Sequence, residues 1–146
     1  MAAMTDYLEN KIIDWLLRGQ SFTPPSTVYV ALFTAAPTDA GGGTEVSGGS
    51  YARVGVACTL SNWAGTQGAG TTTASTGSSG TTSNNVAITF PAPTANWGTV
   101  TAFGLFDAPT GGNLLIYGNL NTPKTINNGD AAPSFAAGAL TFQDDN

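Results

Sequence analysis

The sequence contains no histidine and only one cysteine, Cys58, among its 146 residues. Histidine is the commonest general base and metal ligand near neutral pH, so its absence removes the usual centre of acid–base and metal chemistry. A single cysteine excludes an intramolecular disulfide and a cysteine-bound zinc cluster. A serine or cysteine nucleophile also needs an adjacent base, and no local pattern of carboxylates or lysines supplies one. We therefore expect no catalytic, cofactor-binding or metal-binding residues and no enzymatic activity.

Charged residues are also scarce, with four basic and nine acidic side chains and a net charge of -5. They make up 9% of the sequence, against about 25% in an ordinary soluble domain. No apolar run approaches the roughly 18 residues of a membrane-spanning helix, and residues 1–10 lack the pattern of a secretory signal. We expect neither nucleic acid nor membrane as a partner, because the few cations form no basic patch. These cations are Lys11, Arg18, Arg53 and Lys124.

One stretch, residues 54–106, carries no ionisable side chain except Cys58. Uncharged polar groups can be desolvated through hydrogen bonds without stranding a charge, and the cores of protein interfaces are depleted in charge. We therefore expect this stretch to supply much of any contact with other subunits or with a shell. The charged residues at 6–18, in the turns and at Asp144 and Asp145 are expected to mark surface exposed to water.

Residues 6–18 have the periodicity of an amphipathic helix. Asp6 and Glu9 have the spacing of a capping box, and Gly19 is a typical C-terminal stop. A core helix packed on a sheet of its own chain is the first interpretation. Contact of part of its apolar face with a neighbouring subunit is the alternative. The apolar residues are Leu8, Ile12, Ile13, Trp15, Leu16 and Leu17.

The rest of the chain alternates between segments typical of strands and turns rich in Gly, Pro and Asn. Cys58 falls in one predicted strand with apolar neighbours, where we expect it to be packed and unreactive. The pattern predicts a single mainly β domain over residues 1–146, an antiparallel sandwich or barrel-like sheet of six or seven strands with one N-terminal helix. The predicted strands are residues 27–34, 51–60, 86–90, 100–107, 114–120, 124–126 and 135–142.

Residues 64–85 are a low-complexity segment of Thr, Gly, Ser, Ala, Asn and Gln. Such a long segment inside a small domain is usually functional or a linker. Two interpretations remain open, a flexible loop and an ordered hairpin or arm that contacts a partner. The candidate interaction residues of the chain are Trp15, Trp63, Gly65, Thr71, Thr72, Thr73 and Trp97.

Several segments together resemble a family of small virion proteins from tailed bacteriophages, whose members are often labelled tail fibre proteins. They include VYVALFTAAPTDAG (28–41), GGSYARV (48–54) and the long segment 84–120, with further pieces at residues 7–19, 124–130 and 133–142. The order and spacing match over almost the whole chain. The resemblance implies a capsid decoration or cement protein without catalysis. Such a protein is made in the host cytoplasm and binds the major capsid protein on the virion surface, commonly as a homotrimer.

Two alternatives stay open. A small tail fibre or tail adaptor would fit the label of the family, although the sequence shows no repeats or long shaft. A glycan-binding module on the virion surface would need exposed aromatic platforms, for which Trp63 and Trp97 are the candidates.

Overall fold

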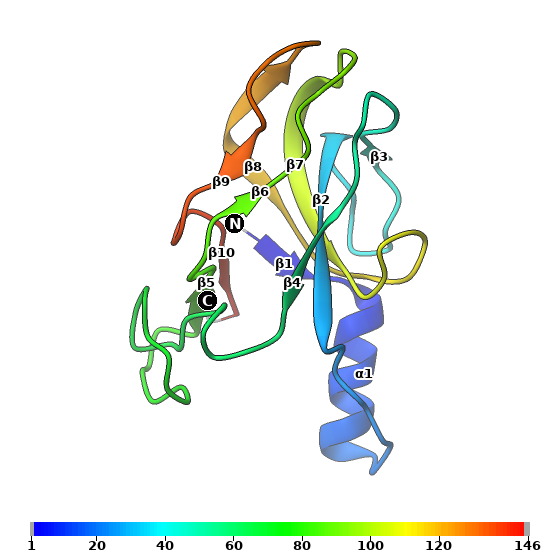
Figure 1. Ribbon diagram of the computed structural model, residues 1–146. Helices are drawn as coiled ribbons and strands as arrows, with labels where there is room; N and C mark the ends of the chain where they lie inside the picture. Colours follow the sequence, from blue (N-terminus) through cyan, green and yellow to red (C-terminus); the bar gives the residue numbers. More distant parts are fainter. Residues whose placement is uncertain (1, 145–146) are drawn as a thin grey trace.

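The computed structural model describes residues 2–144, which contain one helix and ten strands (Figure 1). Every pairing between these strands is antiparallel. The predicted mainly β, sandwich-like fold with one N-terminal helix is therefore confirmed. The elements are β1 (Ala2–Met4), α1 (Asp6–Leu17), β2 (Thr27–Ala35), β3 (Thr44–Glu45), β4 (Val54–Ala57), β5 (Thr81–Ser83), β6 (Ile88–Thr89), β7 (Gly98–Phe106), β8 (Leu114–Ile126), β9 (Ser134–Phe135) and β10 (Thr141–Gln143).

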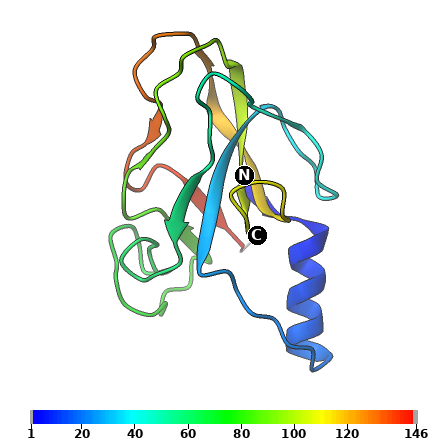
Figure 2. The same cartoon turned by 45° about the vertical axis from the view of Figure 1, so that its right-hand side comes forward.

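The strands form two layers (Figures 1 and 2). One layer is a six-stranded sheet with the order β1, β8, β7, β2, β3, in which β4 also pairs with β2. The second layer contains two small sheets, β5 with β10 and β6 with β9. The main hydrophobic core lies between the layers, because Val30, Leu32 and Phe103 of the large sheet cluster with Ile88 and Leu140 of the other layer.

Strand β2 is buried on both faces. Successive side chains of a strand point to opposite faces of the sheet. Val30 and Leu32 therefore point into the main core, while Ala31 and Phe33 form a smaller cluster with Ala102 on the outer face. This double burial explains why residues 27–34 are an almost continuous run of apolar and β-branched residues.

Arg53 covers the smaller cluster and joins β3 to the turn between β7 and β8. Its guanidinium carbon lies 3.4 Å from the centre of the Phe106 ring, and its Nη2 pairs with Glu45 at 2.7 Å. The same guanidinium donates to the carbonyls of Ala108 and Gly111 in the turn between β7 and β8. The Arg53 side chain is only 7% exposed, and a buried charge is tolerated when it is paired and hydrogen-bonded in this way.

Other charged residues lie at the surface, as expected. Asp6, Glu9, Arg18 and Asp144 are exposed. Asp145 lies outside the described residues.

Several predicted strand boundaries are wrong. The predicted strand 51–60 is reduced to β4, and 86–90 is reduced to β6. The predicted strands 114–120 and 124–126 are one strand, β8, because an irregularity opposite Val100–Ala102 lets the pairing continue past Pro123. The predicted strand 135–142 is split into β9 and β10, and β1, β3 and β5 were not predicted because two or three residues carry no readable periodicity.

The first interpretation of residues 6–18, a helix packed in the core, is wrong. None of the residues of α1 is buried, and both views show the helix projecting away from the two layers (Figures 1 and 2). The N-cap residue is Thr5 rather than Asp6, and the Thr5 side chain bonds to β8 instead of capping the helix. Gly19, with φ +67°, ends the helix in the left-handed conformation expected of it.

Candidate interaction surfaces

The base of α1 is fixed to the large sheet. Thr5 is 1% exposed, and its hydroxyl donates to the carbonyl of Leu114 at 2.6 Å. The Thr5 N–H donates to the carbonyl of Leu115 at 3.0 Å, and the Asp6 N–H donates to the carbonyl of Asp39 at 3.0 Å. Because these bonds all lie at the first turn, they set the direction of the helix and leave its C-terminal half free of the sheets.

The C-terminal half of α1 exposes an apolar surface, the α1 patch, made of Ile13, Trp15, Leu16 and Leu17. Their exposed fractions are 50%, 57%, 65% and 76%. With Ile12, these residues cover about 200° of the helix circumference at 3.6 residues per turn. A helix of 12 residues depends on packing for most of its stability. The α1 patch therefore has the properties of a surface that is covered in an assembly.

A second apolar surface, the Trp63 patch, consists of Cys58, Leu60 and Trp63, which line one shallow pocket. Leu60 is 54% exposed, and Val86 is also exposed close to this patch, since the N–H of the preceding Asn85 donates to the carbonyl of Asn62. Trp63 is partly buried, and its indole N–H has no acceptor among the described residues.

Cys58 does not lie in a strand, and the prediction that it is packed is wrong. Strand β4 ends at Ala57, and Cys58 is exposed. The alternation of residues 51–60 could not show where the strand ends, because Thr59 is as typical of a strand as Val56 is.

The two ends of segment 64–85 form its base, where they are held by strand pairing and backbone hydrogen bonds. The residues between the ends form hydrogen bonds with one another. At the base, β5 pairs with β10, and the Ala64 N–H donates to the carbonyl of Ser83 at 2.8 Å. Above the base, Gly65 is buried, and its N–H donates to the Thr71 hydroxyl at 2.8 Å. Thr72 and Thr73 are exposed. The base is thus an ordered strand pair and residues 65–80 a loop, while contact of this segment with a partner stays a prediction.

Trp97 belongs to the core. It is 5% exposed, and its indole N–H donates to the carbonyl of Gly49 at 2.9 Å. Its ring packs edge-on against Tyr51, with ring centres 5.3 Å apart. Trp97 therefore offers no face on which a sugar could stack, and of the two predicted platforms only Trp63 is near the surface.

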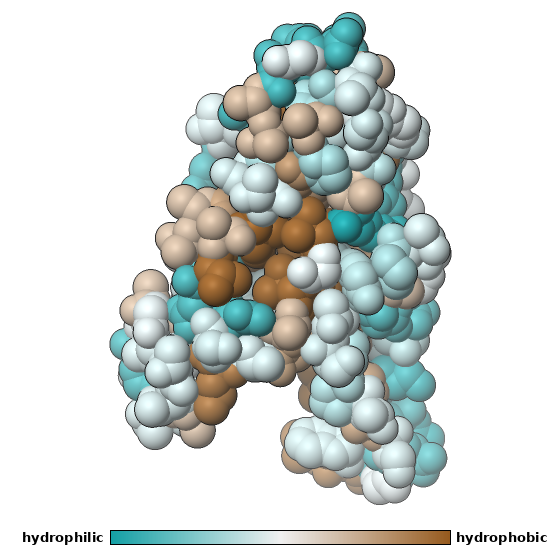
Figure 3. All heavy atoms as spheres, in the orientation of Figure 1, coloured by the Kyte–Doolittle hydropathy of each residue, from teal (hydrophilic) through white to brown (hydrophobic). Residues whose placement is uncertain are grey.

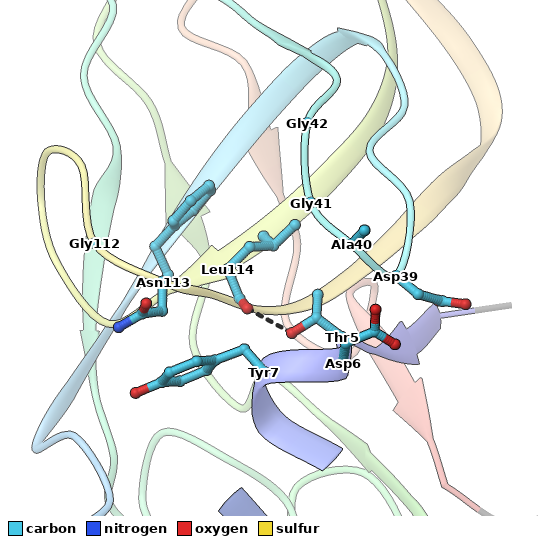
Figure 4. A pocket seen from close by; sticks show the side chains of 11 residues that line it. Thr5, Asp6, Tyr7, Asp39, Ala40, Gly41, Gly42, Gly112, Asn113 and Leu114 are labelled. Atoms are coloured by element: carbon cyan, nitrogen blue, oxygen red, sulfur yellow. Dashed lines mark hydrogen bonds between the residues drawn. The ribbon is translucent and has the colours of Figure 1, made fainter. Parts of the chain in front are cut away.

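A pocket of about 450 Å³ lies where α1 begins, between the loop at residues 39–42 and Asn113–Leu114 (Figure 4). Its ionisable side chains are the carboxylates of Asp6 and Asp39 and the Tyr7 hydroxyl. Nearby, the Tyr117 hydroxyl donates to the Asp39 carboxylate. This bond, more than burial and the neighbouring negative charges, raises the pKa of Tyr117 to about 12. Within residues 2–144, no cluster of three or more Asp, Glu or Cys side chains could bind a metal ion.

Sequence reasoning missed the polar side chains that join distant segments. Thr5, Arg53 and Asn84 each bond to segments far away along the chain. Of these three residues, Arg53 was the one that the sequence could have singled out, because it is the single cation between Arg18 and Lys124.

No helix within residues 2–144 is long and apolar enough to cross a membrane. A family model described as Podophage GP4 fiber I protein gp80 matches residues 3–143 of the chain. No curated protein matches it.

Proposed function

Because the chain belongs to the Podophage GP4 fiber I protein gp80 family, we propose that it is a non-enzymatic structural protein that works by binding other virion proteins. The family description is that of a fibre protein of a podophage, a tailed-phage virion protein as the sequence resemblance implied. The observation that carries the proposal is the α1 patch. Four large apolar side chains project into water from a helix with no buried residue, which is the mark of a surface that binds protein.

We further propose that the protein self-associates, as a homotrimer. Trp15, Leu16 and Leu17 are too exposed for a helix that stays alone in water. The charge-free stretch 54–106 supports the same proposal, because its surface can be covered without desolvating an ion. Sedimentation velocity of the purified chain tests this step, and a single monomeric species at every concentration would contradict it.

For the place in the virion, a fibre-type tail component is the first candidate, since the family description names a fibre. The second candidate is a capsid decoration protein that binds the major capsid protein. It is favoured by the compact sandwich of residues 2–144 (Figure 1), a part of the chain with neither a shaft nor a repeat.

A cryo-EM reconstruction of the virion that contains this chain separates the two candidates. Density at the tail alone supports the fibre, and density over the capsid surface supports decoration. Quantitative mass spectrometry of the same particles is an independent check, because a decoration protein is present in far more copies than a tail fibre. Absence of the chain from purified virions would contradict the proposal as a whole.

A further inference from the structure

The large apolar side chains that residues 2–144 expose gather on two segments at one end of the molecule. Ile13, Trp15, Leu16 and Leu17 lie on α1, while Leu60 and Val86 lie at and beside the Trp63 patch. In Figures 1 and 2, α1 and the loops around residues 58–85 extend toward the same end, on opposite sides of the body. In the space-filling view they form two lobes separated by a notch (Figure 3).

From this arrangement we propose that the α1 patch of one copy binds the Trp63 patch of the next copy. The two patches differ in shape, one a projecting helix and the other a shallow pocket lined by Cys58, Leu60 and Trp63. A contact between two different surfaces of identical chains is head-to-tail, and it closes into a ring when the rotation between copies allows it. The inference rests on the self-association proposed above and states which surfaces make it.

The charges on both sides are suited to this contact. The Trp63 patch lies in the stretch 54–106, which has no charged side chain. On α1, Arg18 Nη1 lies 2.7 Å from Asp14 Oδ1, so these two charges neutralise each other. Glu9 and Lys11 lie one helical turn before Ile13 and Trp15, on the side of the patch toward the base of the helix. In the proposed contact they belong to the rim, where interfaces are polar and accessible to water.

A second copy explains the pair of patches better than a partner of different sequence. Every copy carries both surfaces, so a closed ring covers the α1 patch and the Trp63 patch of each subunit at once. A different protein bound to α1 would leave Leu60 and Val86 in water, and one bound to the Trp63 patch would leave α1 uncovered. Within one subunit, α1 cannot reach the Trp63 patch, because hydrogen bonds of Thr5 and Asp6 fix the base of the helix on the other side of the body.

The single native cysteine allows a direct test, because Cys58 lies in the Trp63 patch and is exposed. Leu17→Cys and, separately, Ile13→Cys each place a second thiol on α1. Under mild oxidation we expect either variant to form disulfide-linked dimers and closed rings on non-reducing gels. Wild type and the matched control Thr122→Cys, which places the thiol on an exposed site of β8, are expected to stay unlinked.

The double variant Leu17→Cys/Cys58→Ser separates this contact from a bundle of helices. The inference predicts that removing Cys58 abolishes the cross-link. If the double variant links as well as Leu17→Cys does, α1 pairs with α1 and the inference is overturned. If neither position 13 nor position 17 links to Cys58 while sedimentation still shows a trimer, the inference is overturned and the proposed trimer stands. A chain that is monomeric throughout overturns both.

Discussion

At the scale of single residues, the fold depends on a few polar side chains that join distant segments. The Tyr51 hydroxyl accepts from the Leu32 N–H at 2.9 Å and donates to Glu45 at 2.9 Å. Its ring stacks on Phe90, with ring centres 6.3 Å apart. Tyr51 thereby links a strand of the large sheet, the Arg53–Glu45 pair and the main core.

Tyr51→Phe is therefore expected to destabilise the protein although it removes a single oxygen. The change leaves the Leu32 N–H without its acceptor inside the sheet, and an unsatisfied buried donor costs about 1–3 kcal/mol. Urea unfolding followed by fluorescence measures the effect. Tyr29→Phe is the matched control, because Tyr29 also lies in the large sheet, on β2, and is only partly buried. Equal unfolding midpoints for the two variants would contradict this role of Tyr51.

Tyr117 gives a second residue-scale prediction, in alkaline solution. Its hydrogen bond to Asp39 raises its pKa from 10 to about 12, so the folded state holds the phenol proton more tightly than the unfolded state does. The resulting stabilisation is complete below pH 10 and is lost as the pH rises toward about 12. A spectrophotometric titration of wild type minus Tyr117→Phe isolates this group. Asp39→Asn is expected to move the transition down in pH, and an unchanged transition would show that the carboxylate is not the cause.

Sequence reasoning at this scale succeeded for the core and failed for the links between segments. Phe33, Phe90 and Phe103 fall in predicted strands and are buried, as large apolar side chains usually are. The partners of Arg53 could not be predicted. Its contacts at Ala108 and Gly111 are carbonyl groups, which any residue type supplies.

At the scale of elements, the sequence predicted the structure of residues 6–18 better than that of residues 64–85. The periodicity of residues 6–18 predicted a helix and its end at Gly19 correctly. It could not show what the apolar face contacts, because the same stripe suits a core and an interface. For residues 64–85 the composition could not reveal β5, since the pairing of Thr81–Ser83 depends on β10 at the other end of the chain.

The loop above β5 is expected to contribute little to the stability of the body. Ser79 donates to the carbonyl of Thr66 at 2.8 Å, so the ends of residues 67–79 are close and a short Gly-Ser linker can replace them. The replaced residues are largely exposed, and shortening a flexible loop to half its length changes the closure cost by only about 0.6 kcal/mol. Thermal unfolding is therefore expected to change little.

Asn84→Ala is the contrasting control for this replacement. Asn84 is fully buried, and its side chain bonds to Val86, Ala136 and Leu140. Removing it leaves several buried groups without partners, each costing about 1–3 kcal/mol. If the loop replacement lowers the melting temperature as much as Asn84→Ala does, the loop is part of the folded core rather than an appendage.

At the scale of the whole molecule, the scarcity of charge reflects the buried core as well as a candidate contact surface. Charges are absent from residues 54–106, yet much of that stretch is the core of the sandwich, including Ile88, Val100 and Phe103. The large apolar side chains of this stretch that are exposed to water, Leu60 and Val86, lie at and beside the Trp63 patch. This part and α1 are therefore the candidates for contact between subunits.

Association through these surfaces predicts a melting temperature that rises with protein concentration, because binding of folded subunits to one another stabilises the folded state by mass action. Trp15→Asp places a charge on the α1 patch, and we expect it to remove the concentration dependence. Its melting temperature should match that of wild type at high dilution, since Trp15 is 57% exposed and its loss leaves the sandwich intact.

Thr122→Asp adds the same charge on β8 and should keep the wild-type dependence of the melting temperature on protein concentration. Differential scanning fluorimetry over a wide dilution series measures all three. A wild-type melting temperature that is constant across the series would show that α1 remains uncovered by other copies.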